Sequence, residues 1–429
     1  MWPFFYNTIA FPLLWLLARI AAIKNQKIKD SIEGKKQIWE RLESHLKNRD
    51  FDKKLIWFHV PSAGEFLQAQ PLLERFLDNG YQCAVTFASI SAEKWIRKAT
   101  INSKNQPLFL DYIPFDFKDS IRRWVKRVKP TALVFVKFDL WPNMIWETSK
   151  LGIPLYLVSA TLHAKTNRYK STIGRSLYKN LYAHFKTILT VGEDDKSRFL
   201  ETTPGIDVRV KGDTRFDSVI NRRDRQNPPE LPEYFKNNRI FIVGSSWPPD
   251  EKCIYPFLKE SLEKYEDLKL ILAPHEPTEE HLLESENYFK DHRLARLSEV
   301  LNGNSKEDLE IILVDSVGVL SSLYHIGTFA YVGGGFTTGV HNVMEPAATG
   351  LPVFFGPIHY NSPEALKLVS DQLAYPVNKP EEFRESLGKL LSNQSLAEDL
   401  GKQSQKFVES QAGATLECFN IISKDIDEN

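Results

Sequence analysis

Residues 55–66 read LIWFHVPSAGEF, a short apolar run that ends in a Pro-Ser-Ala-Gly-Glu turn. A helical pattern follows from Phe66 to Leu77, so this stretch predicts a strand, a turn and a helix in succession. Continuous apolar strands that alternate with helices are typical of a parallel sheet covered on both faces. The stretch therefore predicts an α/β fold.

The same alternation recurs along the chain in two series. Residues 221–238 are polar, contain three prolines and separate the series, as expected of a linker between domains. The sequence therefore predicts two doubly wound, Rossmann-like domains, 49–220 and 239–429, that face each other across a cleft. Further strand-like runs lie at 81–87, 132–136, 153–158 and 187–191 in the first series, and at 240–243, 268–273, 311–314, 328–332 and 351–355 in the second.

Composition excludes several classes of protein. The 429 residues include 55 basic and 55 acidic side chains, a balance that disfavours a general nucleic-acid binder. Three cysteines, far apart in the chain, form neither a disulfide framework nor a zinc-binding spacing. We therefore expect no metal, no cofactor and no nucleic-acid partner.

The first 48 residues form a separate segment. From Trp2 to Ile23 the chain is almost wholly apolar, and Lys24, Lys27 and Lys29 follow at once. About 20 such residues can span a bilayer, and the positive-inside rule then places the remaining chain in the cytoplasm. A helix lying in the headgroup region and a cleaved signal peptide are the alternatives. A charged helical stretch, 31–48, completes this segment.

In the second domain, the run from Tyr331 to Pro346 places three glycines after a strand and before a helix. Glycines let a backbone approach a ligand closely, and helix-start N–H groups hold anions. Loops at 243–248, 273–277 and 314–318 also follow strands, and Asp315 is a candidate helix N-cap. Loops at the carboxyl ends of parallel strands converge on one crevice, which predicts a ligand site. A merely flexible glycine loop is the alternative.

In the first domain, Glu65 lies at a predicted helix start, where the helix dipole favours an ionised carboxylate. Such a group can take a proton from an attacking hydroxyl, although helix-start electrostatics alone also explains it. Lys137 and Asp139 follow another strand and share one face. Arg215, just before the linker, can clamp a phosphate or carboxylate. Surface charge pairs are the alternative for these residues.

Together these motifs resemble the 3-deoxy-D-manno-octulosonic acid (Kdo) transferases of lipopolysaccharide synthesis. The resemblance runs nearly end to end, and it rests on several motifs together. They are the apolar N-terminus and the segments 59–65, 138–143, 212–217, 244–246, 274–277, 333–346 and 355–361.

The resemblance implies a GT-B fold and an inverting, metal-independent transfer of Kdo from CMP-Kdo. The acceptor would be a lipid A precursor, lipid IVA, at the cytoplasmic face of the inner membrane. Glu65 matches the general base, and Lys137, Asp139 and Arg215 lie at the other catalytic positions. Residues matching the donor site are Gly244, Ser245, Ser246, Pro274, His275, Gly318, Val319, Leu320, Asn342, Val343, Met344 and Glu345.

Three positions depart from the family pattern. Arg215 stands where the family usually has a lysine, so the positive charge is kept. Lys137 stands where the family usually has glutamate, and His275 replaces an expected arginine. A GT-B enzyme that uses a UDP-sugar and a membrane-tethered sensor without catalysis are the competing functional hypotheses.

Overall fold

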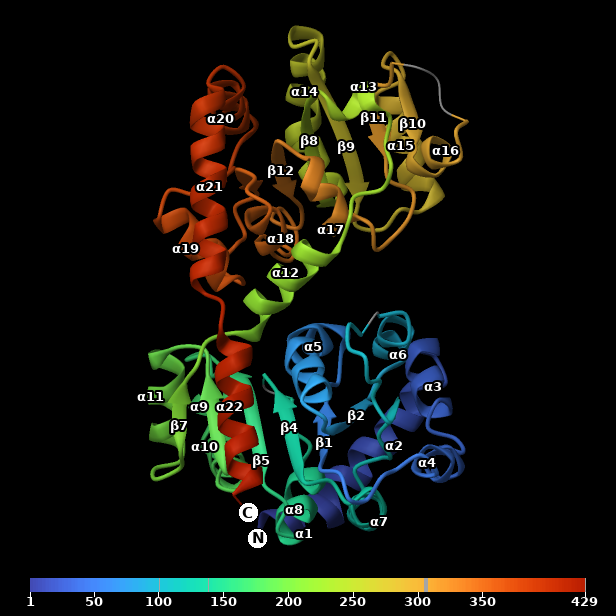
Figure 1. Cartoon of the computed structure of the whole chain (residues 1–429), viewed down its shortest axis with the longest axis vertical. Helices are drawn as coiled ribbons and strands as arrows, with labels where there is room; N and C mark the ends of the chain where they lie inside the picture. Colours follow the sequence, from blue (N-terminus) through green and yellow to red (C-terminus); the bar gives the residue numbers. More distant parts are fainter. Residues whose placement is uncertain (100, 138, 305–307, 429) are drawn as a thin grey trace. The chain divides into compact units, whose positions relative to one another are not determined.

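The protein, seen as a computed structural model, is described at residues 1–99, 101–137, 139–304 and 308–428. Phe138, the first residue of one family motif, lies outside these ranges. The chain forms two compact units: unit 1 contains Met1–Ser218 and Gln411–Asn429, and unit 2 contains Val219–Ser410. Figure 1 labels their elements.

Unit 1 contains a seven-stranded sheet in the order β3-β2-β1-β4-β5-β6-β7. All the strand pairs are parallel, and β1, β4 and β5 are buried along their whole length. The strands are β1 (Leu55–His59), β2 (Gln82–Phe87), β3 (Phe109–Tyr112), β4 (Ala132–Val136), β5 (Leu155–Ala160), β6 (Thr187–Thr190) and β7 (Val208–Val210).

The helices of unit 1 precede its first strand, alternate with its strands and include one from the C-terminus of the chain. They are α1 (Trp2–Phe5), the π-helix η1 (Tyr6–Ala10), α2 (Phe11–Ala21), α3 (Gln26–Glu33), α4 (Ile38–Leu46), α5 (Ala63–Asp78), α6 (Ile90–Ile96), α7 (Lys118–Val128), α8 (Pro142–Lys150), α9 (Asn167–Lys170), α10 (Thr172–Tyr182), α11 (Glu193–Thr202) and α22 (Ala414–Asp427). The helix α12 (Thr214–Arg225) leads from unit 1 into unit 2.

Unit 2 contains a second seven-stranded parallel sheet in the order β10-β11-β9-β8-β12-β13-β14. Its strands are β8 (Arg239–Ser246), β9 (Leu268–Pro274), β10 (Leu294–Arg296), β11 (Ile311–Leu313), β12 (Phe329–Val332), β13 (Val353–Phe355) and β14 (Ala374–Pro376). Its helices are α13 (Glu233–Lys236), α14 (Pro248–Lys264), α15 (Glu279–Tyr288), α16 (Leu297–Leu301), α17 (Leu320–Leu323), the 3-10 helix η2 (Tyr324–Ile326), α18 (Met344–Ala348), α19 (Pro363–Ser370), α20 (Pro380–Leu391) and α21 (Gln394–Ser410).

Each sheet contains a point where the chain moves from one half of the sheet to the other. In unit 1 this point falls between β1 and β4, and in unit 2 it falls between β8 and β12. At such a switch point the connections leave a sheet in opposite directions, and a crevice opens beyond the strand ends. The loops that follow these four strands are therefore where a ligand site is expected.

The domain boundaries differ from the prediction. The C-terminal helix α22 belongs to unit 1, because its buried residues Cys418, Ile422 and Ile426 join the core of that unit. The second domain therefore ends at Ser410 instead of residue 429. Residues 221–238 are not a plain linker either, since α12 continues to Arg225 and α13 follows.

The charged stretch 31–48 forms parts of two helices instead of one. Gln37 lies between α3 and α4 with φ of 55°, a left-handed conformation that interrupts the helical path. Beyond it, Ile38, Leu42 and Leu46 point into the unit 1 core at helical spacing.

Candidate active site

Glu65 lies in the first turn of α5, directly after β1 at the switch point of unit 1. Ser62 caps this helix, since its hydroxyl accepts from the Glu65 N–H at 3.5 Å and donates to the Glu65 carboxylate. Burial raises the pKa of Glu65, while its own backbone N–H and the nearby Lys137 act in the opposite direction. A carboxylate whose pKa is raised towards neutrality is better matched to accept a proton.

Lys137 and Asp139 follow β4, the strand beside β1. Both contribute to the electrostatics of Glu65: Lys137 favours its ionised form and Asp139 disfavours it. Burial raises the pKa of Asp139, and the charge of Arg168 lowers it. The structure thus brings together three of the four predicted catalytic residues around one strand switch.

Lys137 has a backbone conformation that is rare for a side-chain-bearing residue, with φ of 67°. Ser159 in β5 (φ 49°) and Ser245 in β8 (φ 53°) share this left-handed conformation. Each is at or near the carboxyl end of its strand, where such local strain tends to gather at functional sites.

Arg215 is held by its neighbour Asp213. The Asp213 carboxylate accepts from the Arg215 backbone N–H at 2.9 Å and from its Nε at 2.8 Å. Gln68 on α5 donates at 3.1 Å to Oδ1 of this buried carboxylate, the oxygen that also accepts from the Arg215 N–H. Because Glu65 lies one turn earlier on α5, one helix helps to position both the candidate base and the candidate cation.

Sequence reasoning did not predict how other residues support Arg215. Thr214 donates its hydroxyl to the Gln68 carbonyl at 2.7 Å, and its N–H donates to the Ser159 hydroxyl at 3.1 Å. Gln68, Ser159, Asp213 and Thr214 are all buried polar residues. Asp213 and Thr214 are part of the 212–217 motif, but no sequence signal pointed to Gln68.

In unit 2, the glycine loop after β12 packs against the end of β8 at the switch point. The Gly333 N–H donates to the Gly244 carbonyl at 2.8 Å, and the Gly334 N–H donates to the Asp250 carboxylate at 2.9 Å. Asp250, in the first turn of α14, also accepts from Tyr331 at 2.9 Å. Asp250 therefore fixes the glycine loop, a role that the sequence did not reveal.

The glycines serve the packing of the protein's own backbone. A Cβ on Gly333 would lie 2.2 Å from the Ser245 carbonyl oxygen, and one on Gly335 would lie 2.5 Å from the Gly356 nitrogen. The helix that follows the loop, α18, has only five residues and thus a weak dipole. Gly333 and Gly335 therefore have a packing role, and ligand binding by this loop stays a prediction.

Gly333→Ala should destabilise unit 2 by about 1–3 kcal/mol, since backbone atoms must move to admit the new methyl group. Gly388→Ala is the matched control, because Gly388 lies within α20 with no heavy atom within 4 Å of its Cβ position. There alanine should stabilise by about 0.5–1 kcal/mol. Denaturant unfolding of both variants measures the difference, and equal stabilities would contradict the packing role of Gly333.

His275, at the end of β9, stacks on His341 with ring centroids 4.3 Å apart and an interplanar angle of 4°. Trp247 packs on His275 at 4.7 Å and donates its indole N–H to His341 Nε2 at 3.1 Å. These three rings form a stack beside Ser245 and Ser246, where a planar base could pack. The predictions included His275 but gave no role to His341 or Trp247.

Burial and, secondarily, His275 lower the pKa of His341 to about 4. In the unfolded chain, His341 has the usual histidine pKa of about 6.5. Between about pH 4 and about pH 6.5 the unfolded chain therefore binds more protons at His341 than the folded protein does. Stability should therefore fall as the pH drops from about 6.5 to about 4. His341→Gln should flatten this slope in denaturant unfolding measured over that range, and an unchanged slope would contradict the assignment.

The remaining donor-site residues lie in two other loops of unit 2. Gly318 has φ of 96° and precedes Val319 and Leu320 at the start of α17. The Asn342 side chain accepts from the Met344 N–H at 3.1 Å, directly before α18. Within α18, Glu345 pairs with Arg222 at 2.9 Å, a partner that the sequence did not suggest.

Asp315 does not cap the helix that follows it. Its carboxylate accepts from the Ser298 N–H at 3.2 Å and from the Ser298 hydroxyl, near the start of α16. The N-cap of α17 is Val319 instead. Asp315 therefore tethers its loop to α16, the helix after β10.

Ser246 is fixed from beneath by a buried network. Its hydroxyl donates to Glu251 at 2.6 Å, and His281 Nε2 lies 2.9 Å from the same carboxylate oxygen. The carboxylate lies between the serine and the histidine, so the histidine cannot take the serine proton directly. This network positions the 244–246 loop.

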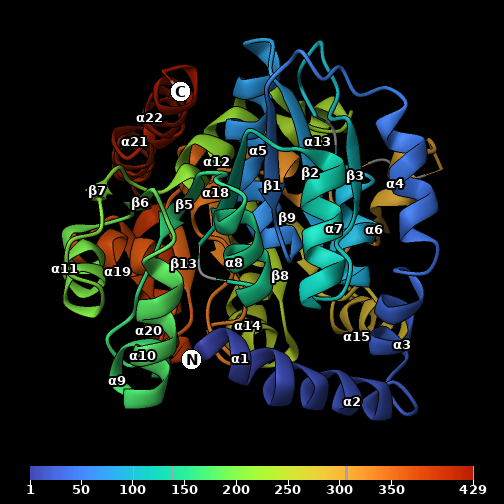
Figure 2. The ribbon, with the colours of Figure 1, turned by 90° about the horizontal axis from the view of Figure 1, so that it is seen from below.

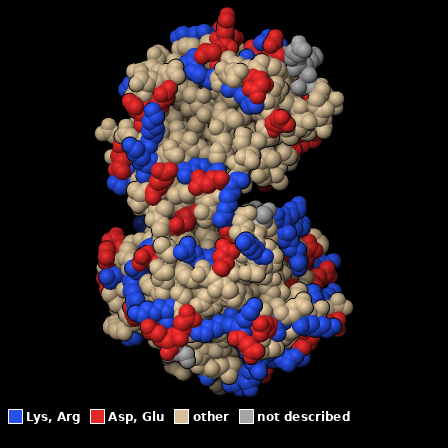
Figure 3. Space-filling model, viewed as in Figure 1, with Lys and Arg blue, Asp and Glu red and all other residues tan. Residues whose placement is uncertain are grey.

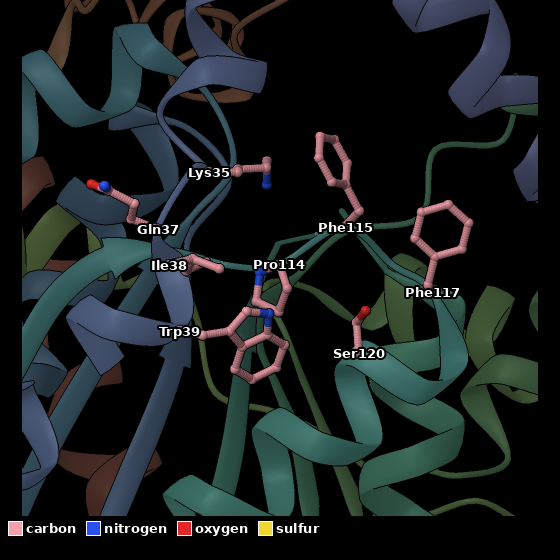
Figure 4. Close-up of a pocket in the computed structure, with 8 residues that line it drawn as sticks. All are labelled: Lys35, Gln37, Ile38, Trp39, Pro114, Phe115, Phe117 and Ser120. Atoms are coloured by element: carbon pink, nitrogen blue, oxygen red, sulfur yellow. The ribbon is translucent and has the colours of Figure 1, made fainter. Parts of the chain in front are cut away.

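A hollow of unit 1, drawn in Figure 4, has none of the predicted site residues in its lining. Lys35 points into it and donates to the Ile113 carbonyl at 2.6 Å; burial lowers its pKa to about 7. The bond ties the end of α3 to the loop after β3, which is a structural role. The residues lining the hollow are Lys35, Gln37, Ile38, Trp39, Pro114, Phe115, Phe117 and Ser120.

The charged side chains at the surface and the possible metal ligands do not point to a further site. Both signs of charge are interspersed over the face drawn in Figure 3, in keeping with the zero net charge. Among the residues that the structure describes, no three His, Cys, Asp or Glu side chains gather where they could hold a metal ion.

The two parallel sheets, each with its switch-point loops, place the protein in the GT-B fold class. Solved structures with this fold include a putative UDP-N-acetylglucosamine 2-epimerase from Listeria monocytogenes, with a TM-score of 0.62 and 14% identity over 88% of this chain and 98% of that one. MurG of Acinetobacter baumannii matches with a TM-score of 0.53 and 15% identity, over 87% and 99% of the two chains.

Comparison with protein sequences identifies relatives of one kind of glycosyltransferase. The family model described as 3-Deoxy-D-manno-octulosonic-acid transferase (kdotransferase) matches residues 36–218. The 3-deoxy-D-manno-octulosonic acid transferase of Haemophilus influenzae is 25% identical over 100% of both chains. That of Chlamydophila psittaci is 28% identical over 73% of this chain and 72% of its own. The resemblance is thus confirmed: the protein is a glycosyltransferase related over its whole length to the Kdo transferases.

Proposed function

We propose that this enzyme transfers Kdo from CMP-Kdo to a lipid A precursor, lipid IVA, with inversion and without a metal ion. The observation that carries the proposal is the site around Glu65. This carboxylate has a raised pKa, lies at the switch point of unit 1 and shares helix α5 with the residue that braces Asp213 and Arg215. The names of the sequence relatives supply the sugar.

In the proposed reaction, an acceptor hydroxyl attacks the anomeric carbon of Kdo and forms the new glycosidic bond. The bond from that carbon to the phosphate oxygen breaks, and its electron pair leaves with CMP. Glu65 accepts the hydroxyl proton, and Arg215 offsets the charge that develops on the departing phosphate. Asp139 and Lys137 adjust the pKa of Glu65 in opposite directions.

The proposed donor site comprises the switch-point loops of unit 2. The backbone of Gly244, Ser245 and Ser246 and the stacked rings of His275 and His341 offer donors and a flat surface. The loops 318–320 and 342–345 complete the set of residues that match the family's CMP-binding positions. Work on a lipid acceptor would place the enzyme at the cytoplasmic face of the inner membrane.

The direct test is to incubate the purified protein with CMP-Kdo and lipid IVA and to follow CMP release and the mass of the lipid product. We expect one CMP for each Kdo added. CMP release at the same rate without the lipid, or no product at all, would contradict the transfer.

A UDP-sugar enzyme is the second candidate, because UDP-N-acetylglucosamine 2-epimerases share the fold. Thermal-shift titration with CMP and UDP separates the two. If the enzyme uses CMP-Kdo, CMP should raise its melting temperature at concentrations where UDP has little effect. A larger effect of UDP than of CMP would favour a UDP-sugar donor.

A further inference from the structure

The helical segment at residues 2–21 exposes a large apolar surface. It is the one described segment that is long and apolar enough to cross a membrane, judged by length and composition alone. Its exposed residues include Phe4 at 74% and Ile9, Leu13 and Leu14 at 53–56%. A contiguous apolar surface of this kind marks a contact with a membrane or a protein. Further exposed members are Phe5, Leu16, Leu17, Ile20 and Ile23.

On its other side, the same helix contacts the rest of unit 1 through polar side chains. The Tyr6 hydroxyl donates to the buried Asp116 carboxylate at 2.9 Å. The side-chain amides of Asn7 and Asn143 bond reciprocally, with both distances 2.9 Å. These bonds join the N-terminal helix to the loop before α7 and to the start of α8.

Asp116 is committed to the globular fold as well. Its carboxylate also accepts from the N–H groups of Asn143 and Met144, both at 3.0 Å, at the start of α8. Tyr6 thus completes a carboxylate that already caps a helix of unit 1, so its bond is part of a buried network. Breaking it would remove one of the three hydrogen bonds named here that the buried Asp116 carboxylate accepts.

Aromatic contacts extend the attachment along the helix. Phe11 packs on Phe117 with ring centroids 4.8 Å apart, and Trp15 packs on the same ring at 6.0 Å. Tyr6 packs on Trp146 at 5.6 Å. Figure 2 shows α1 and α2 as a dark-blue helix lying along unit 1. A helix attached along its length in this way is not surrounded by lipid, as a spanning helix must be.

Basic side chains gather at the C-terminal end of this helix. Arg19, Lys29 and Lys36 line a hollow between α2 and α3, together with the apolar Ile23 and Ile32. Lys24 lies between α2 and α3, Lys27 lies in the first turn of α3, and Glu33 is the one acidic residue among those lining the hollow. Cations beside an apolar face fit the phosphates and acyl chains of anionic phospholipids.

We propose that residues 2–23 form a membrane-surface helix that lies in the plane of an anionic bilayer while it stays attached to unit 1. The exposed apolar row enters the headgroup and acyl boundary, and the hollow with Arg19, Lys29 and Lys36 takes phospholipid phosphates. This inference rests on the proposed function, which uses a lipid acceptor, and it specifies how the enzyme would contact the membrane that holds this lipid.

Depth measurement with spin labels tests the orientation. Single cysteines at Phe5, Leu13 and Ile20 carry the label on the full-length protein, since the native cysteines are all buried. In vesicles of phosphatidylethanolamine and phosphatidylglycerol, the three labels should lie at similar depths, about 5–10 Å below the surface. A spanning helix would separate Phe5 from Ile20 by roughly 20 Å, and that result would overturn the proposal.

The basic hollow has its own test. Lys29→Gln combined with Lys36→Gln should weaken binding to the phosphatidylglycerol vesicles by about fivefold per lysine, and binding to phosphatidylcholine vesicles should change little. Lys402→Gln, a substitution of an exposed lysine in unit 2, is the matched control and should bind as the unchanged protein. Equal binding of all variants would overturn the headgroup assignment. Neither measurement uses donor or acceptor, so both can fail independently of Kdo transfer.

Discussion

Glu65→Gln should lower the turnover of Kdo transfer by about 10²–10⁴-fold, the usual contribution of a positioned general base. Glutamine keeps the shape and the helix-start position but cannot accept the proton of the acceptor hydroxyl. Donor affinity should be unchanged, because the proposed donor site lies in unit 2. Initial rates of CMP release with lipid IVA, combined with calorimetric binding of CMP, measure both quantities.

Glu193→Gln is the matched control for Glu65. Glu193 is also in the first turn of a helix, α11, that follows a strand of the same sheet, but it is exposed and contacts only Lys196 at 3.5 Å among its ion pairs in the described residues. Its substitution should leave turnover within about twofold, since surface changes rarely matter. Equal, small effects of both substitutions would favour helix-start electrostatics over catalysis at Glu65.

The pH dependence of transfer sharpens the same test. Burial raises the pKa of Glu65. The rate of transfer should therefore increase with pH over a range that lies above the usual pKa of a glutamate side chain. Lys137 favours the ionised carboxylate, and Lys137→Met should move that rise to still higher pH.

Arg215→Ala should lower turnover by about 10²–10³-fold, the cost of losing one preorganised group that stabilises transition-state charge. The effect should fall mainly on kcat if Arg215 acts on the departing phosphate, and mainly on the donor KM if it only binds the ground state. Steady-state kinetics over a range of CMP-Kdo concentrations separates these outcomes.

Two further substitutions control for charge and for position. Arg215→Lys keeps the positive charge and should retain most of the activity, although the Nε bond to Asp213 is lost. Arg209→Ala removes an exposed arginine of β7 that pairs with Asp207 at 2.8 Å, and it should change turnover little. If Arg215→Ala were as active as Arg209→Ala, Arg215 would have no part in the reaction.

Much of the fold followed from apolar runs, and the strands that sequence reasoning missed share a physical cause. The missed strands, β3, β7, β10 and β14, are the edges of the two sheets and have three or four residues each. An edge strand has one hydrogen-bonded neighbour and is partly exposed, so it lacks a long apolar signal. The interior strands are buried on both faces and were all predicted.

The candidate site was predictable where a motif follows a central strand. Glu65, Lys137 and Asp139 come from β1 and β4, and Gly244 to Ser246 end β8, so each lies at a switch point. Their roles as catalytic and donor-binding residues stay predictions.

The supporting residues were out of reach for a different reason. Gln68 and Asp213 are 145 positions apart in the sequence, and they come into contact only when the strands of the unit 1 sheet have assembled. The same holds for Trp247 with His341 and for Arg222 with Glu345, whose contacts join elements that are far apart in the sequence. Sequence patterns report local structure, and these pairs depend on tertiary packing.

The return of α22 to unit 1 sets how the protein can be divided. Unit 2 is a single stretch, Val219–Ser410, whereas unit 1 is made from two pieces of chain. A gene fragment that stops before residue 411 would remove Cys418, Ile422 and Ile426 from the unit 1 core and the Asp217 bonds to Gly413 and Thr415. Unit 1 is therefore best produced with a short linker that replaces unit 2, and the first junction has to allow for α12, which runs across the boundary at Val219.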